Sequence, residues 1–357
     1  MPALSVSLGG RNGYNGVVVL LRKHRIALVA LAAVLALGLA ACGGGDEGGD
    51  GDAFLAGVVS DVGRFNDRGF NQLALKGCED SESELGTECR AIESRSTADY
   101  VPNFARLIRD GAGLSVATGF LLAEATNTAA ERFPDARFAI VDYSATADPF
   151  GGARPNVLGL TFATNENSYM IGCLAARMAE QDGGNTISAV GGIKIPTVDI
   201  FIAAYRAGAE RCVPGTQTLI DYSQDFVDQA KCKELALNQI NRGANVVFQV
   251  AGGCGLGALD AAREQDVWGI GVDTDQSFLG PHILTSAVKR VDVAVLEAIR
   301  SAVEDEFAGG TDLTFDLENE GVGIGEISPE VPQEFIDEMN DLEPLILSGE
   351  IVPPTGV

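Results

Sequence analysis

Strand-like and helix-like segments alternate along most of this chain, and this alternation restricts its fold more than any other sequence feature. Short apolar runs, such as 54–60 and 137–142, are each followed by a segment with helical spacing of its apolar residues, such as 69–77 and 165–181. Alternating β and α segments predict parallel sheets covered by helices on both faces. Because the part from residue 53 onward exceeds one comfortable α/β core, we expect two similar lobes.

The N-terminus is typical of an export signal. A basic cluster at 22–25 precedes an apolar run at 26–39, and 14 residues are too few to cross a membrane, which takes about 20. Small residues then precede Cys42, a pattern that resembles a lipobox. We expect a lipoprotein signal peptide at 1–41, cleaved before a lipidated Cys42; the alternative is an ordinary signal peptide with a chance cysteine.

The segment after Cys42 is rich in glycine and acidic residues, which predicts a flexible tether at 42–52. We therefore expect the protein at the cell membrane, lipid-anchored on the extracytoplasmic face through Cys42. The formal net charge is −25 and the pI is near 4.3, so nucleic acid is not an expected partner.

Six cysteines remain if Cys42 carries lipid, and an even number in an exported protein suggests disulfides. Sequence alone leaves fifteen pairings open. We expect two local pairs, with the last pair following by elimination. The expected pairs are Cys78–Cys89, Cys212–Cys232 and Cys173–Cys254. No CxxC spacing occurs, so we expect no metal site.

Acidic residues stand at the ends of several predicted strands, where parallel sheets bind small ligands. They are Asp61, Asp142, Asp221 and Asp273. Each could equally serve a turn or a helix cap. Phe70 and Phe201 begin predicted helices, where they could sandwich a flat ligand or pack in the core.

Catalytic motifs are sparse. Residues 253–258 match the dinucleotide pattern GxGxxA, but they follow most of the strands, so we interpret these glycines as packing positions and expect no cofactor. The sequence has no P-loop, HExxH or GxSxG motif. We therefore expect no catalytic residues and no enzyme. Paired carboxylates among Asp61, Asp142 and Asp273 keep a hydrolase as the alternative.

Several stretches, in order and spacing, carry a family resemblance. They read SDVGRFNDRGFNQ at 60–72, DYVPNF at 99–104, RFAIVD at 137–142, NVLGLTF at 156–162, GGIKIP at 191–196, GVDTDQ at 271–276 and LTSAVKR at 284–290. Together they resemble the basic membrane protein (BMP) family of purine-nucleoside-receptor-type lipoproteins. Arg64 departs from the pattern, since family members usually carry a glycine there.

The resemblance implies a type I periplasmic-binding-protein fold, with two doubly wound lobes joined by a hinge. We expect 53–163 plus about 275–320 to form lobe 1, and 164–274 plus about 321–357 to form lobe 2. The implied function is an extracytoplasmic substrate-binding protein of an ABC importer that captures nucleosides, purine ones in particular. Its implied partners are a nucleoside ligand, ABC permease subunits and the lipid bilayer.

The resemblance also implies roles for eight residues. Phe70 and Phe201 would stack on the base from opposite lobes, and Asp142 and Asn71 would read its edge. Asp273 and Lys289 would hold the ribose hydroxyls, while Asp61 and Gly252 would line the pocket. Three alternatives stay open: an extracytoplasmic nucleoside hydrolase, a sugar receptor on the same fold, and a signalling receptor without a permease.

Overall fold

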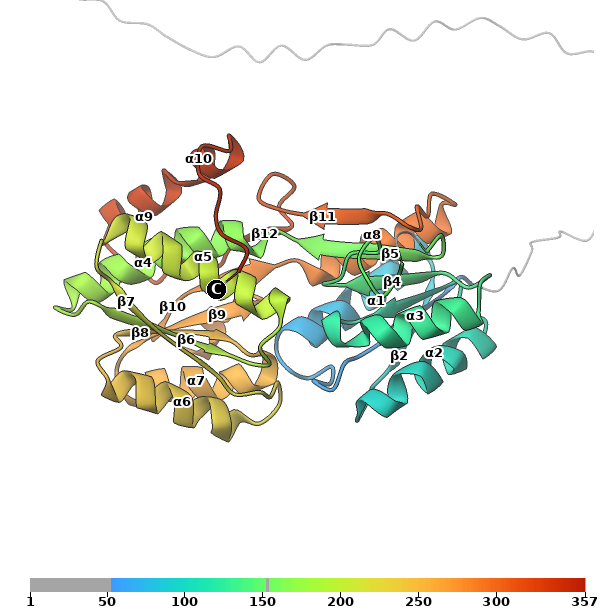
Figure 1. Ribbon diagram of the computed structural model, residues 1–357, viewed down its shortest axis with the longest axis horizontal. Helices are drawn as coiled ribbons and strands as arrows, with labels where there is room; N and C mark the ends of the chain where they lie inside the picture. The colour runs from blue at the N-terminus through green and yellow to red at the C-terminus, as the bar shows by residue number, and fades with distance from the viewer. Residues whose placement is uncertain (1–52, 152–153, 357) are drawn as a thin grey trace, which may run out of the picture. The chain divides into compact units, whose positions relative to one another are not determined.

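The computed structural model describes residues 53–151 and 154–356. The expected signal peptide at 1–41, Cys42 and the tether at 43–52 lie outside the described residues. The described residues form one compact unit, which contains two six-stranded sheets (Figure 1). No helix in the described part of the chain is both long and apolar enough to span a membrane.

The first sheet has the order β11-β5-β4-β3-β1-β2, and all its neighbouring strands are parallel. Its strands are β1 (Leu55–Val59), β2 (Glu88–Ile92), β3 (Leu114–Ala117), β4 (Phe138–Val141), β5 (Val157–Phe162) and β11 (Asp312–Phe315). Its helices are α1 (Phe70–Leu85), α2 (Tyr100–Arg109), α3 (Ala123–Arg132) and α8 (Val291–Val303), with 3-10 turns at Thr97–Asp99 and Phe120–Leu122. α1 and α8 cover one face, and α2 and α3 cover the other.

The second sheet has the order β12-β10-β9-β8-β6-β7, with β12 antiparallel to β10. Its strands are β6 (Thr186–Gly191), β7 (Gln217–Tyr222), β8 (Val246–Val250), β9 (Trp268–Asp273), β10 (Ile283–Lys289) and β12 (Val322–Ile324). Its helices are α4 (Thr164–Gln181), α5 (Pro196–Cys212), α6 (Gln229–Asn241), α7 (Gly252–Glu264), α9 (Gln333–Asn340) and α10 (Glu343–Leu347), with a 3-10 turn at Ser277–Leu279. Figure 1 shows α4 and α5 above this sheet and α6 and α7 below it.

Apolar residues alternate between the two faces of the second sheet, which explains its two separate cores. Ala189 and Phe248 point into the core under α4 and α5, whereas the next residue on β6, Val190, points into the core under α6 and α7. Both faces of the central strands are buried, as a doubly wound sheet requires. The alternating pattern therefore produced the α/β lobes that the sequence predicts.

One predicted lobe boundary is wrong. We expected about 275–320 to return to the first lobe, but β10 pairs in parallel with β9 and so belongs to the second sheet. The chain re-enters the first lobe only with α8. Three connections thus link the sheets, namely β5 to α4, β10 to α8 and β11 to β12. β2 was not expected from the sequence, because it is an edge strand whose residues are half-buried or exposed.

The disulfide Cys78–Cys89 is confirmed, but the other two predicted pairs are wrong. The structure pairs Cys173 with Cys212 and Cys232 with Cys254. Cys212 ends α5 on one face of the second sheet, whereas Cys232 lies on α6 on the other face, so the sheet separates them. Each bridge instead joins two helices that pack side by side, α4 with α5 and α6 with α7.

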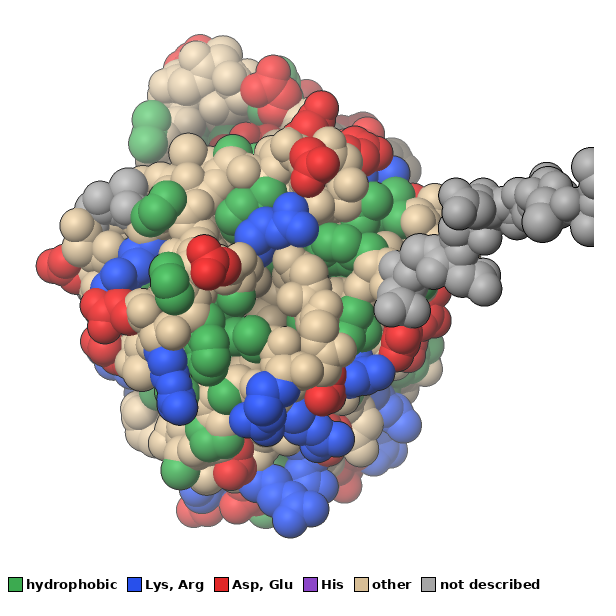
Figure 2. Space-filling view, turned by 90° about the vertical axis from the view of Figure 1, so that its right-hand side faces the viewer, with side chains coloured by type: hydrophobic (Ala, Val, Ile, Leu, Met, Phe, Trp, Pro, Cys, Tyr) green, Lys and Arg blue, Asp and Glu red, His purple; other side chains and the backbone are tan. Residues whose placement is uncertain are grey.

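Charged side chains on the surface are often paired locally despite the acidic composition. On β2, Arg90 forms ion pairs with Glu88 at 2.7 Å and with Asp110 at 3.0 Å. Figure 2 shows Lys and Arg side chains gathered in the lower part of one face, with acidic side chains among and above them. Such exposed pairs contribute little to stability individually.

Candidate ligand-binding site

A cavity lies between the two sheets, at the carboxyl ends of β1 and β4 on one side and of β8, β9 and β10 on the other. It comprises about 590 Å³ of space between side chains, part of it open to solvent. All eight residues expected at the site line it. They are Asp61, Phe70, Asn71, Asp142, Phe201, Gly252, Asp273 and Lys289. That these residues bind a ligand stays a prediction.

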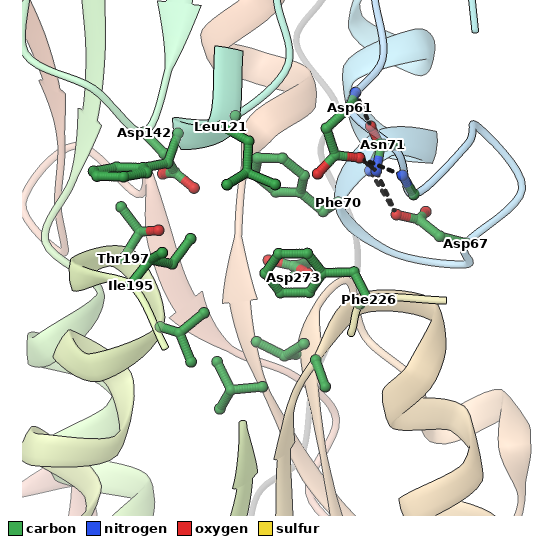
Figure 3. A pocket seen from close by; sticks show the side chains of 18 of the residues that line it. Asp61, Asp67, Phe70, Asn71, Leu121, Asp142, Ile195, Thr197, Phe226 and Asp273 are labelled. Atoms are coloured by element: carbon green, nitrogen blue, oxygen red, sulfur yellow. Dashed lines mark hydrogen bonds between the residues drawn. The ribbon is translucent and has the colours of Figure 1, made fainter. Parts of the chain in front are cut away.

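The loop before α1 forms a hydrogen-bonded network on the first-lobe side. The Asp67 carboxylate accepts from the backbone N–H groups of Gly69, Asn71 and Gln72, and so caps the start of α1. The Asn71 side-chain amide donates to Asp61 at 2.9 Å and to Asp67 at 3.1 Å (Figure 3). Both hydrogens of that amide are therefore used within the protein, so Asn71 is placed to orient the two carboxylates.

Asp61 is buried at the base of this network. One of its oxygens accepts from the Gly63 N–H at 2.6 Å and from Asn71, and burial raises the pKa of Asp61 to about 6 despite these hydrogen bonds. Gly63 has no room for a side chain, because an added Cβ would lie 2.6 Å from the Asn71 amide nitrogen. This close packing fixes the direction in which Asp61 faces the cavity.

Aromatic rings form facing walls of the cavity. Phe70, the first residue of α1, enters from the first lobe, and Phe226, from the loop between β7 and α6, enters from the second (Figure 3). Phe201 lines the cavity as well, but it is only 2% exposed and its ring packs edge-on against Phe248. Phe226 was not among the residues expected from the sequence, although it follows the end of a strand as the predicted carboxylates do.

Lys289 and Asp142 form a buried ion pair near the connection between the lobes. The Lys289 Nζ donates to both Asp142 oxygens at 2.6 Å. It also lies 4.8 Å from the ring centroids of Phe70 and Phe162, where cation–π attraction stabilises a charge. Lys289 thus supplies the cavity with a fixed positive charge whose nearest carboxylate is Asp142.

Among the cavity carboxylates of the described residues, Asp273 has the fewest hydrogen-bond partners. It ends β9 and is 6% exposed, and within the described residues no hydrogen bond to its carboxylate oxygens is found. Burial raises the pKa of Asp273 to about 7, with Lys289 lowering it and the Asp67 and Asp142 charges raising it further. Asp273 is therefore a buried acceptor directed at the cavity.

Two of these carboxylates stand on strained backbone. Asp142 and Asp273 both have φ of 66°, in the left-handed region, which Asp and Asn tolerate better than other non-glycine residues. Such conformations tend to cluster at functional sites.

Other predicted features lie elsewhere. Asp221 does not line the cavity, because β7 continues to Tyr222 and the Asp221 carboxylate accepts from Gln239 on α6. The glycines at 253–258 serve packing, since a Cβ on Gly257 would lie 1.9 Å from the Gln229 carbonyl oxygen. Within the described residues, one cluster of three potential metal ligands occurs, but two of its members are Cys173 and Cys212, which are bridged to each other.

Comparison with known proteins identifies the family. The Bmp family, described as ABC transporter substrate-binding protein PnrA-like, matches residues 54–355. The chain belongs to the Bmp family. This Bmp-family chain is 32% identical over 361 residues to the ABC transporter nucleoside-binding protein BmpA of Lactococcus lactis subsp. cremoris, covering 94% of the chain and 100% of that relative. It is 28% identical to basic membrane protein A of Borreliella burgdorferi, over 82% of the chain and 86% of the relative.

Further similarities concern the fold and the class of protein. The Bmp-family chain resembles the crystal structure of an ABC transporter solute-binding protein from Aeropyrum pernix K1, with a TM-score of 0.77 and 25% identity over 84% of this chain and 94% of that one. The two-lobed type I periplasmic-binding fold is thereby established. A relative from Pyrococcus horikoshii, 32% identical over 85% of this chain and 78% of its own, is named a lipoprotein. The protein is a substrate-binding protein of the ABC transporter class.

Proposed function

We propose that this protein captures nucleosides, purine ones in particular, for an ABC importer and releases them unchanged. The name of the Lactococcus lactis relative supports a nucleoside as the ligand class. The cavity supports it independently through its chemistry. A nucleoside has a flat apolar base and a sugar rich in hydroxyl donors, and so needs both aromatic faces and acceptors.

The observation that carries this proposal is the placement around one cavity of two rings and of Asp273, whose carboxylate accepts no hydrogen bond from the part of the chain that the structure describes. Phe70 and Phe226 come from opposite lobes, so lobe closure would enclose a base between them. Stacking of a base on an aromatic side chain is worth about 1–3 kcal/mol. Phe201, the residue first expected in this role, would form the wall beside Lys289, whose Nζ is 5.8 Å from its ring centroid.

The polar groups suit a neutral ligand with several donors. Asp273 would accept hydrogen bonds from the ribose hydroxyls, and charge-assisted bonds of this kind are strong. Asp61 would accept from the base or sugar, held in position by Asn71 and Gly63. The Asp142–Lys289 pair would offer one donor group and one acceptor group in fixed geometry, and Gly252 would let the ligand approach the start of α7.

Calorimetry with adenosine, guanosine, inosine, cytidine and ribose tests the proposal. We expect nucleosides to bind, purines most tightly, and free ribose not to compete, because ribose lacks the stacking surface. Tight binding of ribose with no response to any nucleoside would instead support a sugar receptor. Incubation with inosine should release no hypoxanthine, and release would support the hydrolase alternative.

We further propose that the protein is held on the extracytoplasmic face of the membrane by lipid on Cys42, and that it delivers its ligand to permease subunits. The support is the family, whose members include named lipoproteins, and the small residues before the cysteine.

A further inference from the structure

The ring of Phe226 is carried by a loop rather than by a helix or strand. The loop spans 223–228, between β7 and α6, and Phe226 is half-buried. A loop side chain that is mobile before binding loses conformational freedom when a ligand stacks on it, and this loss weakens affinity. Whatever holds the loop in place beforehand therefore contributes to binding.

Backbone hydrogen bonds fix the loop at two places. At its start, the Ser223 N–H donates to the Gly191 carbonyl at 2.9 Å and the Gln224 N–H to the Gly192 carbonyl at 3.1 Å. At its centre, the Phe226 carbonyl accepts from the Cys254 N–H at 3.0 Å. The ring covers Gly192 so closely that an added Cβ there would lie 2.3 Å from a ring carbon. The position of the ring thus depends on the start of α7, where Cys254 lies.

The disulfide Cys232–Cys254 ties that same residue to the helix that follows the loop. Cys232 lies in the first turns of α6 and Cys254 at the start of α7, both fully buried, with their Cα atoms 5.6 Å apart. The Cys254 sulfur also lies 3.5 Å from the Ser223 hydroxyl oxygen. The bridge therefore joins α6, which follows the loop, to Cys254, whose backbone N–H donates to the Phe226 carbonyl at the centre of the loop.

We propose that the Cys232–Cys254 disulfide is a positioning element that holds the Phe226 ring ready to stack on a ligand. It acts through Phe226 and does not touch the ligand. The inference rests on the proposed function, because it assumes that a flat ligand stacks on this ring. The bridge Cys173–Cys212 lies in the same lobe but joins α4 to the far end of α5, away from the cavity lining, so it serves as the matched control.

The test compares two double variants of the whole mature protein by calorimetry with inosine and guanosine. C232A/C254A should weaken binding by about two- to tenfold, the effect of ordering one side chain. C173A/C212A should lower the thermal stability but leave the dissociation constant unchanged. In a Phe226→Ala background, C232A/C254A should cause no further loss, because the ring through which the bridge acts is gone.

Three outcomes separate the possibilities. Equal affinity of folded C232A/C254A and the wild type would overturn the inference, and so would an equal loss with and without the Phe226 ring. If C232A/C254A does not fold, C232V/C254A, which refills part of the space between α6 and α7, takes its place under the same criteria. Failure of the wild type itself to bind any nucleoside would refute the proposed function instead.

Discussion

Replacing Asp273 by asparagine should make the ligand-free protein more stable at pH 8 while weakening its binding of nucleosides. The carboxylate is buried, with Asp67 and Asp142 adding negative charge nearby, and its pKa is raised from 3.8 to about 7. Asparagine has nearly the same shape and tolerates the φ of 66° at this position. The substitution therefore removes the charge with little change to the backbone.

The magnitude follows from linkage between protonation and folding. Because the folded-state pKa lies above the unfolded value, the carboxyl favours folding most below about pH 4, and this contribution is lost as the pH rises through 7. A rise from 3.8 to about 7 corresponds to about 4 kcal/mol, since each tenfold change in acidity is worth about 1.4 kcal/mol. The free energy of unfolding of D273N minus that of the wild type should therefore increase by up to about 4 kcal/mol between pH 4 and pH 8.

Urea unfolding of ligand-free D273N and wild type at several pH values measures this difference. Burial of the new amide adds an offset of about 1–3 kcal/mol, but this offset does not change with pH and so leaves the trend intact. A stability difference that is constant from pH 4 to pH 8 would refute the reasoning, because it would mean that the charge of Asp273 costs nothing in the folded state.

Binding should move in the opposite direction. Loss of a charged acceptor for the sugar hydroxyls should weaken nucleoside binding by roughly 10- to 150-fold, or about 1.5–3 kcal/mol. In the wild type, affinity should rise between pH 5 and pH 8 as Asp273 and Asp61, with pKa values of about 7 and about 6, become ionised acceptors. Asp221→Asn, on the same sheet but outside the cavity lining, should leave affinity unchanged.

Three further changes test separate parts of the structure. Phe226→Ala should weaken nucleoside binding by about 1–3 kcal/mol in calorimetry. The control Phe278→Ala removes a 60% exposed ring outside the cavity lining and should leave nucleoside binding unchanged. Equal losses of affinity in the two variants would contradict stacking on Phe226. Gln276→Ala removes a 3.2 Å hydrogen bond from the Gln276 Nε2 to the Arg68 carbonyl, which joins the two lobes. Stopped-flow measurements should therefore show nucleoside dissociation about two- to tenfold faster. An unchanged dissociation rate would show that this contact does not hold the lobes closed. Cys42→Ala should yield uncleaved or soluble protein in cell fractionation, because the lipid would attach to that thiol. Recovery of the Cys42→Ala variant in the membrane as a normally processed lipoprotein would rule out the lipobox.

The alternation of strand and helix segments was enough to predict the α/β lobes and the sheet edge where three carboxylates of the cavity lie, whereas Asn71, Gly252 and Lys289 were expected only from the family resemblance. Parallel strands align their carboxyl ends at one edge of a sheet, so Asp61, Asp142 and Asp273 could be placed together from their positions after predicted strands. The same rule would have found Phe226, which lies a few residues beyond β7. It failed for Asp221 because the end of that strand was placed too early.

Features that join distant segments were decided only by the tertiary structure. Whether Cys212 can reach Cys173 or Cys232 depends on which face of the sheet each helix covers, and spacing along the chain does not record that choice. The sheet that β10 joins is likewise set by pairing with β9. Hydrophobic periodicity reports that a residue faces a core, but not which one. Sequence therefore determined the elements and the edge where ligand groups gather, while packing between helices and strands far apart in the chain determined the bridges, the lobe boundary and the residues that hold the site in place.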